Sequence, residues 1–100
     1  MCGATVGGQA LDAVDVARQA VIQGVVMRDD SPVAGAYVRL LDAGGEFVAE
    51  VPTSATGHFR FFAAPGRWTL RTLAPRTGPV DRPVVAARGR VVEVSVPLSG

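Results

Sequence analysis

Apolar and polar residues alternate with a period of two along much of the chain after residue 19, a pattern typical of β-strands. Turn residues interrupt the pattern roughly every 8–12 positions. The predicted strands are Ala20–Arg28, Ala36–Asp42, Glu46–Thr53, His58–Ala63, Arg67–Leu73, Val84–Ala87 and Val91–Pro97. Short strands at this spacing indicate a single all-β domain, an antiparallel β-sandwich.

The segments between the strands carry turn chemistry. Asp29–Pro32 is a turn cluster and Ala64–Gly66 a tight corner. Ala74–Pro83 carries three prolines and a glycine, so we predict a surface loop there. Residues 1–19 begin with a glycine-rich stretch and have no sustained period, which predicts a flexible or partly extended leader before a sandwich of residues 20–100.

Alternation within each strand selects the side chains of one shared core. The predicted core residues are Ile22, Val38, Leu40, Phe59, Phe61, Trp68, Leu70, Val92 and Val94. Side chains between them point to the outer faces, which predicts that Tyr37, Arg60 and Phe62 are exposed and form a partner-docking surface. His58 shares that outward orientation and is expected in solvent.

Composition narrows the function classes. The 100 residues are 48% hydrophobic and 19% charged, which excludes disorder over most of the chain. A net charge of +1 excludes a strong electrostatic attraction to nucleic acid or membrane. Residues 1–20 lack the features of a signal peptide, and no apolar run approaches the roughly 20 residues that span a bilayer. We therefore expect a cytoplasmic protein.

Several chemistries are excluded by residue counts. All ten basic residues are arginine, so a lysine Schiff base or a Lys–Asn isopeptide bond cannot form. A single cysteine excludes an internal disulfide and a cysteine-based zinc cluster. The scattered carboxylates show no metal-ligand spacing, and His58 has no nucleophile at a recognisable spacing. We expect no metal, no cofactor and no catalytic constellation.

Four segments resemble the carboxypeptidase regulatory-like domains: Ile22–Val26, Pro32–Leu40, Ala55–Phe61 and Ala64–Leu70. In that pattern glycine and proline provide turns, and alternate aromatic residues fill the core. The resemblance implies a seven-stranded prealbumin-like sandwich, also described as transthyretin-like or Ig-like. It carries over no catalytic residue.

A second resemblance extends over the whole chain. The Met-Cys-Gly start, the run Ala36–Asp42 and above all the run Phe59–Arg71 are similar to the small actinobacterial proteins labelled SseC. Genes of that family typically lie beside a rhodanese-type thiosulfate sulfurtransferase. The resemblance implies a role near sulfur transfer, with such an enzyme as the protein partner.

Cys2 is the candidate sulfur acceptor. Removal of Met1 would leave Cys2 at the N-terminus, with its thiol beside the α-amine. A nearby protonated amine favours the thiolate, the form that exchanges persulfides. The alternative is that the thiol has no role.

Three function classes follow from the sequence. We favour a non-enzymatic adaptor that accompanies a sulfurtransferase. A carbohydrate-binding or other ligand-binding module using exposed aromatic residues is the alternative, and an enzyme is the least supported. A homodimer formed through the edge of Val91–Pro97 is also compatible with the pattern.

Overall fold

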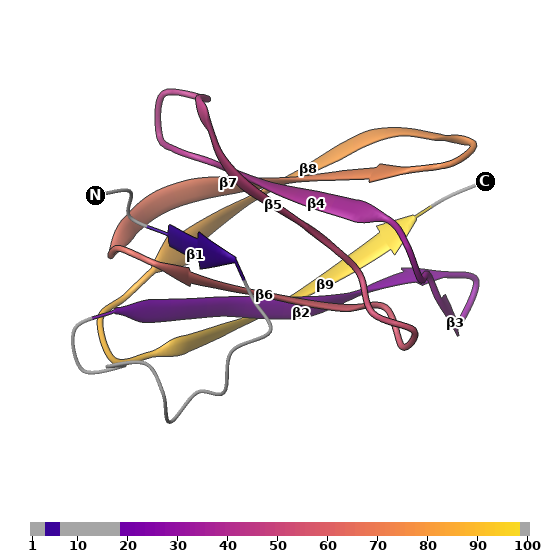
Figure 1. The fold of residues 1–100 in the computed structure, drawn as a ribbon, viewed down its shortest axis with the longest axis horizontal. Coiled ribbons are helices and arrows are strands. Elements are labelled where there is room, and N and C mark those ends of the chain that lie inside the picture. The colour runs from indigo at the N-terminus through magenta and orange to yellow at the C-terminus, as the bar shows by residue number, and fades with distance from the viewer. Residues whose placement is uncertain (1–3, 7–18, 99–100) are drawn as a thin grey trace.

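The computed structural model describes residues 4–6 and 19–98, and the regular structure of these residues is entirely β-strand. The strands are β1 (Ala4–Val6), β2 (Ala20–Arg28), β3 (Ser31–Pro32), β4 (Tyr37–Leu41), β5 (Phe47–Pro52), β6 (His58–Ala63), β7 (Gly66–Ala74), β8 (Thr77–Ala86) and β9 (Val91–Leu98). They form two sheets packed face to face (Figure 1). The predicted all-β sandwich is confirmed.

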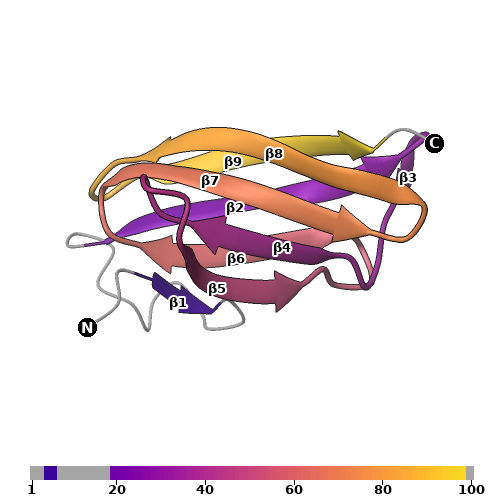
Figure 2. The ribbon, with the colours of Figure 1, turned by 90° about the horizontal axis from the view of Figure 1, so that it is seen from above.

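Sheet A has the order β1-β6-β2-β9, and the short β3 pairs with the C-terminal end of β2. Sheet B has the order β5-β4-β7-β8. Figure 2 shows β8 beside β9 along one side of the sandwich and β5 beside β1 along the other. β9 runs parallel to β2, whereas the other pairs are antiparallel.

Two details of the predicted sandwich are corrected, the number of strands, which was seven, and the antiparallel direction of every pair. The described residues form nine strands, because the short β1 and β3 extend sheet A. The parallel pair arises because the chain passes from sheet A to sheet B and back twice, through β4–β5 and through β7–β8, before β9 lies beside β2. Parallel neighbours need a long connection of this kind, which local sequence patterns do not reveal.

Strand positions follow the alternation closely. β2 and β6 have the predicted bounds, and β4, β5, β7 and β9 differ from them by no more than one residue at either end. The predicted turn after β2 is a two-residue hairpin in which Asp29 and Asp30 have φ of 50° and 67°. Aspartate tolerates this left-handed backbone, and two such residues are typical of a type I′ turn.

The loop predicted at Ala74–Pro83 is wrong for most of its length. Thr77–Pro83 belongs to β8, whose ten residues pair with β7. β8 is the last strand of sheet B, so its second side has no neighbouring strand among the described residues. Proline is tolerated on such an edge because its missing N–H is not needed by a neighbour.

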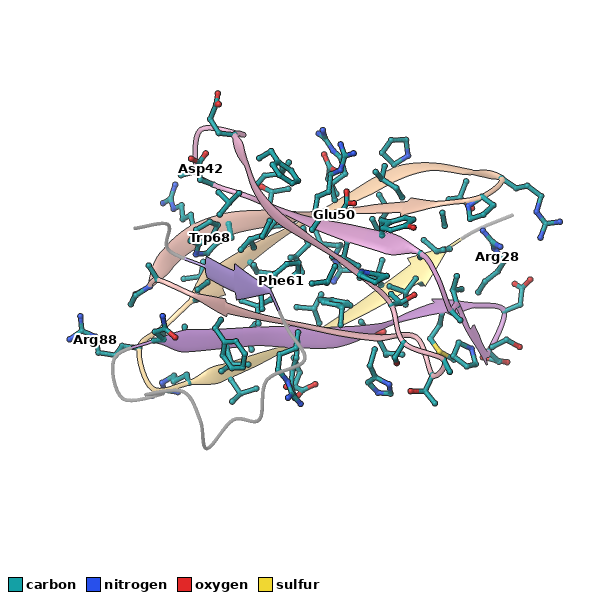
Figure 3. All side chains as sticks on the ribbon, in the orientation of Figure 1. Arg28, Asp42, Glu50, Phe61, Trp68 and Arg88 are labelled. Carbon is teal, nitrogen blue, oxygen red and sulfur yellow. The ribbon has the colours of Figure 1, made fainter. Side chains whose placement is uncertain are left out.

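The core lies between the sheets, and Figure 3 shows Phe61 there. Eight of the nine predicted core residues are buried, and Val92 is only partly buried against them. Trp68 is 9% exposed, and its indole Nε1 donates a hydrogen bond to the Ala64 carbonyl at 2.9 Å. The ring is therefore anchored in the core, as expected.

Candidate partner-binding surface

The three predicted docking residues do not form one surface. Tyr37 lies on the outer face of sheet B and is 48% exposed. Arg60 lies on the outer face of sheet A, on the opposite side of the sandwich. The structure therefore separates Tyr37 from Arg60.

The expected exposure of Phe62 is corrected. Phe62 does point away from the main core, as alternation predicts, but its side chain is fully buried. Its register partner Val21 on β2 is also fully buried on that outer face. Alternation gives the face to which a side chain points, whereas tertiary packing decides whether that face is covered.

Cys2 lies outside the described residues, and so does most of the predicted leader. Within residues 1–19 the structure describes β1, which pairs with the C-terminal half of β6, and Gln19. The role of Cys2 as a sulfur acceptor stays a prediction.

A row of four charged residues crosses the outer face of sheet B. Reading from β5 to β8, the row is Glu50, Arg39, Arg71 and Asp81. Arg39 Nε donates to Glu50 Oε1 at 2.7 Å, and Arg71 donates to both carboxylate oxygens of Asp81 at 2.9 and 3.0 Å. Figure 3 shows Glu50 at sheet B. Two ion pairs therefore lie side by side, and the charges within the row cancel.

The pairing changes the proton affinity of the second pair. The hydrogen bonds from Arg71 hold the pKa of Asp81 below its usual range. The hydrogen bonds and charge of Asp81 raise the pKa of Arg71 in turn. Both side chains remain more than two-fifths exposed, so water screens the attraction and the pair contributes little stability.

Large apolar side chains flank this charged row. Among the described residues, the exposed large hydrophobics are Tyr37, Phe47, Val85 and Val91, and the first three lie on the outer face of sheet B. Phe47 is 59% and Val85 66% exposed. The guanidinium of Arg39 lies over the Phe47 ring, 5.7 Å from its centroid. We call this face, from β5 to β8, the sheet B surface.

Phe47 and Val85 were not selected from the sequence. A β-bulge pairs Leu40 with Ala49 but Leu41 with Phe47, which leaves Val48 as an extra residue. Simple alternation from the buried Ala49 would point Phe47 inward, and the bulge points it outward. Val85 falls within the predicted strand Val84–Ala87, but the interpretation of Ala74–Pro83 as a loop leaves that strand too short to indicate which face Val85 occupies.

Sheet A carries a polar ladder on its outer face. Arg60, Gln23 and Glu93 are register neighbours on β6, β2 and β9. Arg60 Nε donates to Gln23 Oε1 at 3.0 Å, and Gln23 Nε2 donates to Glu93 Oε2 at 2.6 Å. The ladder borders a hollow of about 460 Å³ that also contacts Pro52 and Phe59.

The remaining candidate groups form no larger cluster in the part of the chain that is described. His58 is exposed, as expected, and its Nδ1 is hydrogen-bonded to Thr56 Oγ1 at 2.8 Å. No three histidine, cysteine or acidic side chains of residues 19–98 lie close enough to share a metal ion. The described residues also include no helix long and apolar enough to cross a membrane.

Comparison with protein families gives a match over nearly the whole chain. The model of the family described as "Protein of unknown function (DUF1416)" matches residues 2–98. The chain belongs to this family. This DUF1416 protein is 48% identical over 101 residues to the uncharacterized protein Rv0814c of Mycobacterium tuberculosis, covering 99% of this chain and all of that one. An uncharacterized protein of Mycolicibacterium smegmatis is 58% identical over 62 residues, covering 61% of this chain and 69% of that protein.

Solved structures similar to this DUF1416 protein are more distant. The minor pilin GBS52 of Streptococcus agalactiae has a TM-score of 0.71 at 15% identity, covering 82% of this chain and 44% of the pilin. The major pilin BcpA of Bacillus cereus has a TM-score of 0.68 at 20% identity, covering 80% of this chain and 28% of that pilin. Catechol 1,2-dioxygenase from Pseudomonas arvilla has a TM-score of 0.65 at 12% identity, covering 89% of this chain and 54% of the dioxygenase chain.

The chain spans less than half the length of each pilin. At these identities the likeness shows the β-sandwich fold alone. Pilins and an enzyme occur together among the neighbours, so the fold does not indicate a function, and a function has to be argued from the surface of this protein.

Proposed function

We propose that this protein is a non-enzymatic β-sandwich adaptor whose partner is a rhodanese-type thiosulfate sulfurtransferase. The observation that carries the adaptor role is that three of the four large hydrophobics exposed among the described residues, Tyr37, Phe47 and Val85, share the outer face of sheet B. Exposed apolar side chains concentrated on one face of a small domain are typical of a protein interface. The choice of partner is supported by the similarity of Phe59–Arg71 and of the Met-Cys-Gly start to the SseC proteins.

The chemistry of the sheet B surface suits a protein partner. Aromatic residues and arginine are the types that contribute most to interface affinity, and this surface presents Tyr37 and Phe47 beside Arg39 and Arg71. Arg39 and Arg71 are already paired with carboxylates, so docking would not bury either of these two guanidinium groups without a partner. Arg60, on sheet A, would remain outside this interface.

Cys2 is the sulfur acceptor in this proposal. The Cys2 thiol loses its proton to solvent, and the thiolate attacks the outer sulfur of a persulfide on the sulfurtransferase. A new sulfur–sulfur bond forms on Cys2 while the old one breaks, and the enzyme cysteine leaves as a thiolate. No external oxidant or reductant is consumed. The same proposal puts the protein in the cytoplasm, where thiols stay reduced.

Intact mass spectrometry tests the acceptor role. The protein is incubated with a rhodanese-type sulfurtransferase and thiosulfate, and Cys2→Ser is the control. The expected result is a gain of one sulfur atom on the wild type alone, reversed by a thiol reductant. No gain on a protein with a free thiol would reject Cys2 as the acceptor and leave the adaptor role to be judged by binding.

Calorimetric titration with the sulfurtransferase tests the docking role. Tyr37→Ala and Phe47→Ala are each expected to weaken binding about 30-fold, since truncation of an interface hot spot costs about 2 kcal/mol or more. Val91→Ala is the matched control, because Val91 is a similarly exposed apolar residue (45%) on sheet A. Equal losses in all three variants, or none in any, would reject the sheet B surface as the docking site.

The second candidate function is a module that binds a small polar ligand such as a sugar. Its support is the hollow of about 460 Å³ beside the Arg60–Gln23–Glu93 ladder, since the volume is in the range of small-molecule sites. Phe62 contributes nothing to this role because it is buried. Binding on a glycan array that Gln23→Ala abolishes and Tyr37→Ala retains would favour this function over the adaptor.

A further inference from the structure

A groove lies at one end of the sheet B surface, next to the start of β7. It has a volume of about 520 Å³ and is formed by Ala43, Arg67, Trp68, Thr69, Pro83, Val84 and Val85. Arg67 on β7 and Val85 on β8 are register partners, so a guanidinium and an exposed aliphatic side chain occupy adjacent positions. A charged and an apolar contact are therefore available together.

Arg67 differs from the other arginines of this surface. Arg39 and Arg71 are bound to Glu50 and Asp81, whereas Arg67 makes no ion pair or side-chain hydrogen bond with any residue in 19–98. No acidic side chain lines the described groove.

The nearest candidate acid in the sequence is already engaged. Asp42, in the turn beside Ala43, accepts hydrogen bonds from the backbone N–H groups of Gly44 and Glu46, both at 2.9 Å. Its carboxylate holds the β4–β5 turn, which Figure 3 shows at the edge of the molecule. No acidic side chain of residues 19–98 forms an ion pair with Arg67, so its guanidinium is available to a ligand carboxylate.

We propose that this groove binds a short acidic and aliphatic peptide segment of a protein partner. A carboxylate of the segment would pair with Arg67, since a guanidinium binds carboxylates in a two-pronged geometry. An adjacent aliphatic side chain would pack on Val85, Pro83 and Ala43. The inference rests on the proposed adaptor function and specifies which chemistry of the partner is recognised.

A peptide titration followed by amide NMR tests the proposal. The probe is the blocked pentapeptide acetyl-Ala-Leu-Asp-Leu-Ala-amide, and its comparison has Asn in place of Asp. We expect shifts confined to the amides of Ala43, Arg67, Thr69 and Val85, with the Asp peptide binding about 5-fold more tightly than the Asn peptide, as for an exposed ion pair.

Arg67→Gln and Arg76→Gln are the matched pair of variants. Both remove one exposed arginine, and Arg76 lies between β7 and β8, outside the groove. We expect Arg67→Gln to abolish the preference for the Asp peptide and Arg76→Gln to keep it. Preserved amide spectra establish that both variants are folded.

Several outcomes would overturn the proposal. They are equal binding of the two peptides, shifts centred on another face, an equal effect of both variants, and no shift at millimolar peptide. Inorganic phosphate that reproduces the shifts at the same concentration would indicate a simple anion site instead. If the sulfurtransferase binds Arg67→Gln normally but not Tyr37→Ala, the adaptor role stands and only the groove is rejected.

Discussion

Arg71 on β7 and Asp81 on β8 are register partners on the outer face of sheet B, and two hydrogen bonds join the guanidinium to the carboxylate. The pKa of Asp81 is lowered by these bonds, so the folded protein binds a proton at this carboxylate less readily than the unfolded chain. The pair therefore stabilises the fold at neutral pH. That contribution disappears as the pH falls below 3.8, the ordinary aspartate value.

Asp81→Asn is expected to remove this pH-dependent contribution. Its urea midpoint should lie slightly below that of the wild type at neutral pH and equal it well below pH 3.8, where the wild-type carboxylate is also protonated. The difference should be small because the pair is exposed. Glu46→Gln, which removes an exposed carboxylate from the β4–β5 turn, is the control. A gap that persists unchanged in acid would contradict the assignment.

Gly24→Ala is expected to destabilise the contact between β2 and β9. A methyl group on Gly24 would overlap the Val94 carbonyl oxygen and come within 2.9 Å of the Phe59 ring. Backbone cannot move aside as a flexible side chain can, so we expect a loss of about 1–3 kcal/mol in the free energy of unfolding. Gly78→Ala is the control, because a methyl group there meets no atom within 4 Å. Equal stability of the two variants in urea would refute this account.

Phe62→Ala is expected to cost stability rather than binding. Phe62 is fully buried, and truncating a buried phenylalanine typically costs about 3–5 kcal/mol. Tyr37→Ala, at a residue 48% exposed, should change the free energy of unfolding by less than about 1 kcal/mol. Thermal and urea unfolding of both variants separate the two roles. A stable Phe62→Ala protein that no longer bound its partner would restore Phe62 as a docking residue.

Much of the fold could be predicted because alternation is a local signal. The bounds of β2 and β6 follow directly from it, and so does the inward direction of Phe59 and Phe61. The Thr77–Pro83 part of β8 could not be predicted, because Pro79 and Pro83 are unfavourable in a strand with neighbours on both sides. Their position is acceptable only once β8 is known to be an edge.

The candidate surface was harder to predict than the fold. Phe47 faces outward because a bulge at Val48 changes the alternation of inward and outward side chains. The residues around Val48 carry no sequence signal that predicts this bulge. Arg67 was one of several arginines in the C-terminal half. What distinguishes it is that the carboxylates of Glu50 and Asp81 are bound to other arginines, which depends on the strand register.

The free edge of β9 is covered in part by a side chain from the other sheet. β9 pairs with β2 on one side, and its second side has no neighbouring strand among the described residues. Arg82 on β8 reaches across from sheet B and donates a hydrogen bond from Nη1 to the Ser95 carbonyl at 3.0 Å. A second chain adding a strand here would need that carbonyl, so Arg82 protects the edge. A homodimer through β9, which the sequence pattern permits, would require Arg82 to leave Ser95.

Arg82→Ala should therefore increase self-association. We expect the wild type to elute as a monomer, and the variant to form a dimer whose fraction rises with protein concentration in size-exclusion chromatography with light scattering. Arg88→Ala is the matched control, since Arg88 is an exposed arginine in the turn before β9 (Figure 3). It removes the same charge, so dimerisation of both variants would point to net charge as the cause. A monomeric Arg82→Ala protein would contradict the protective role of Arg82.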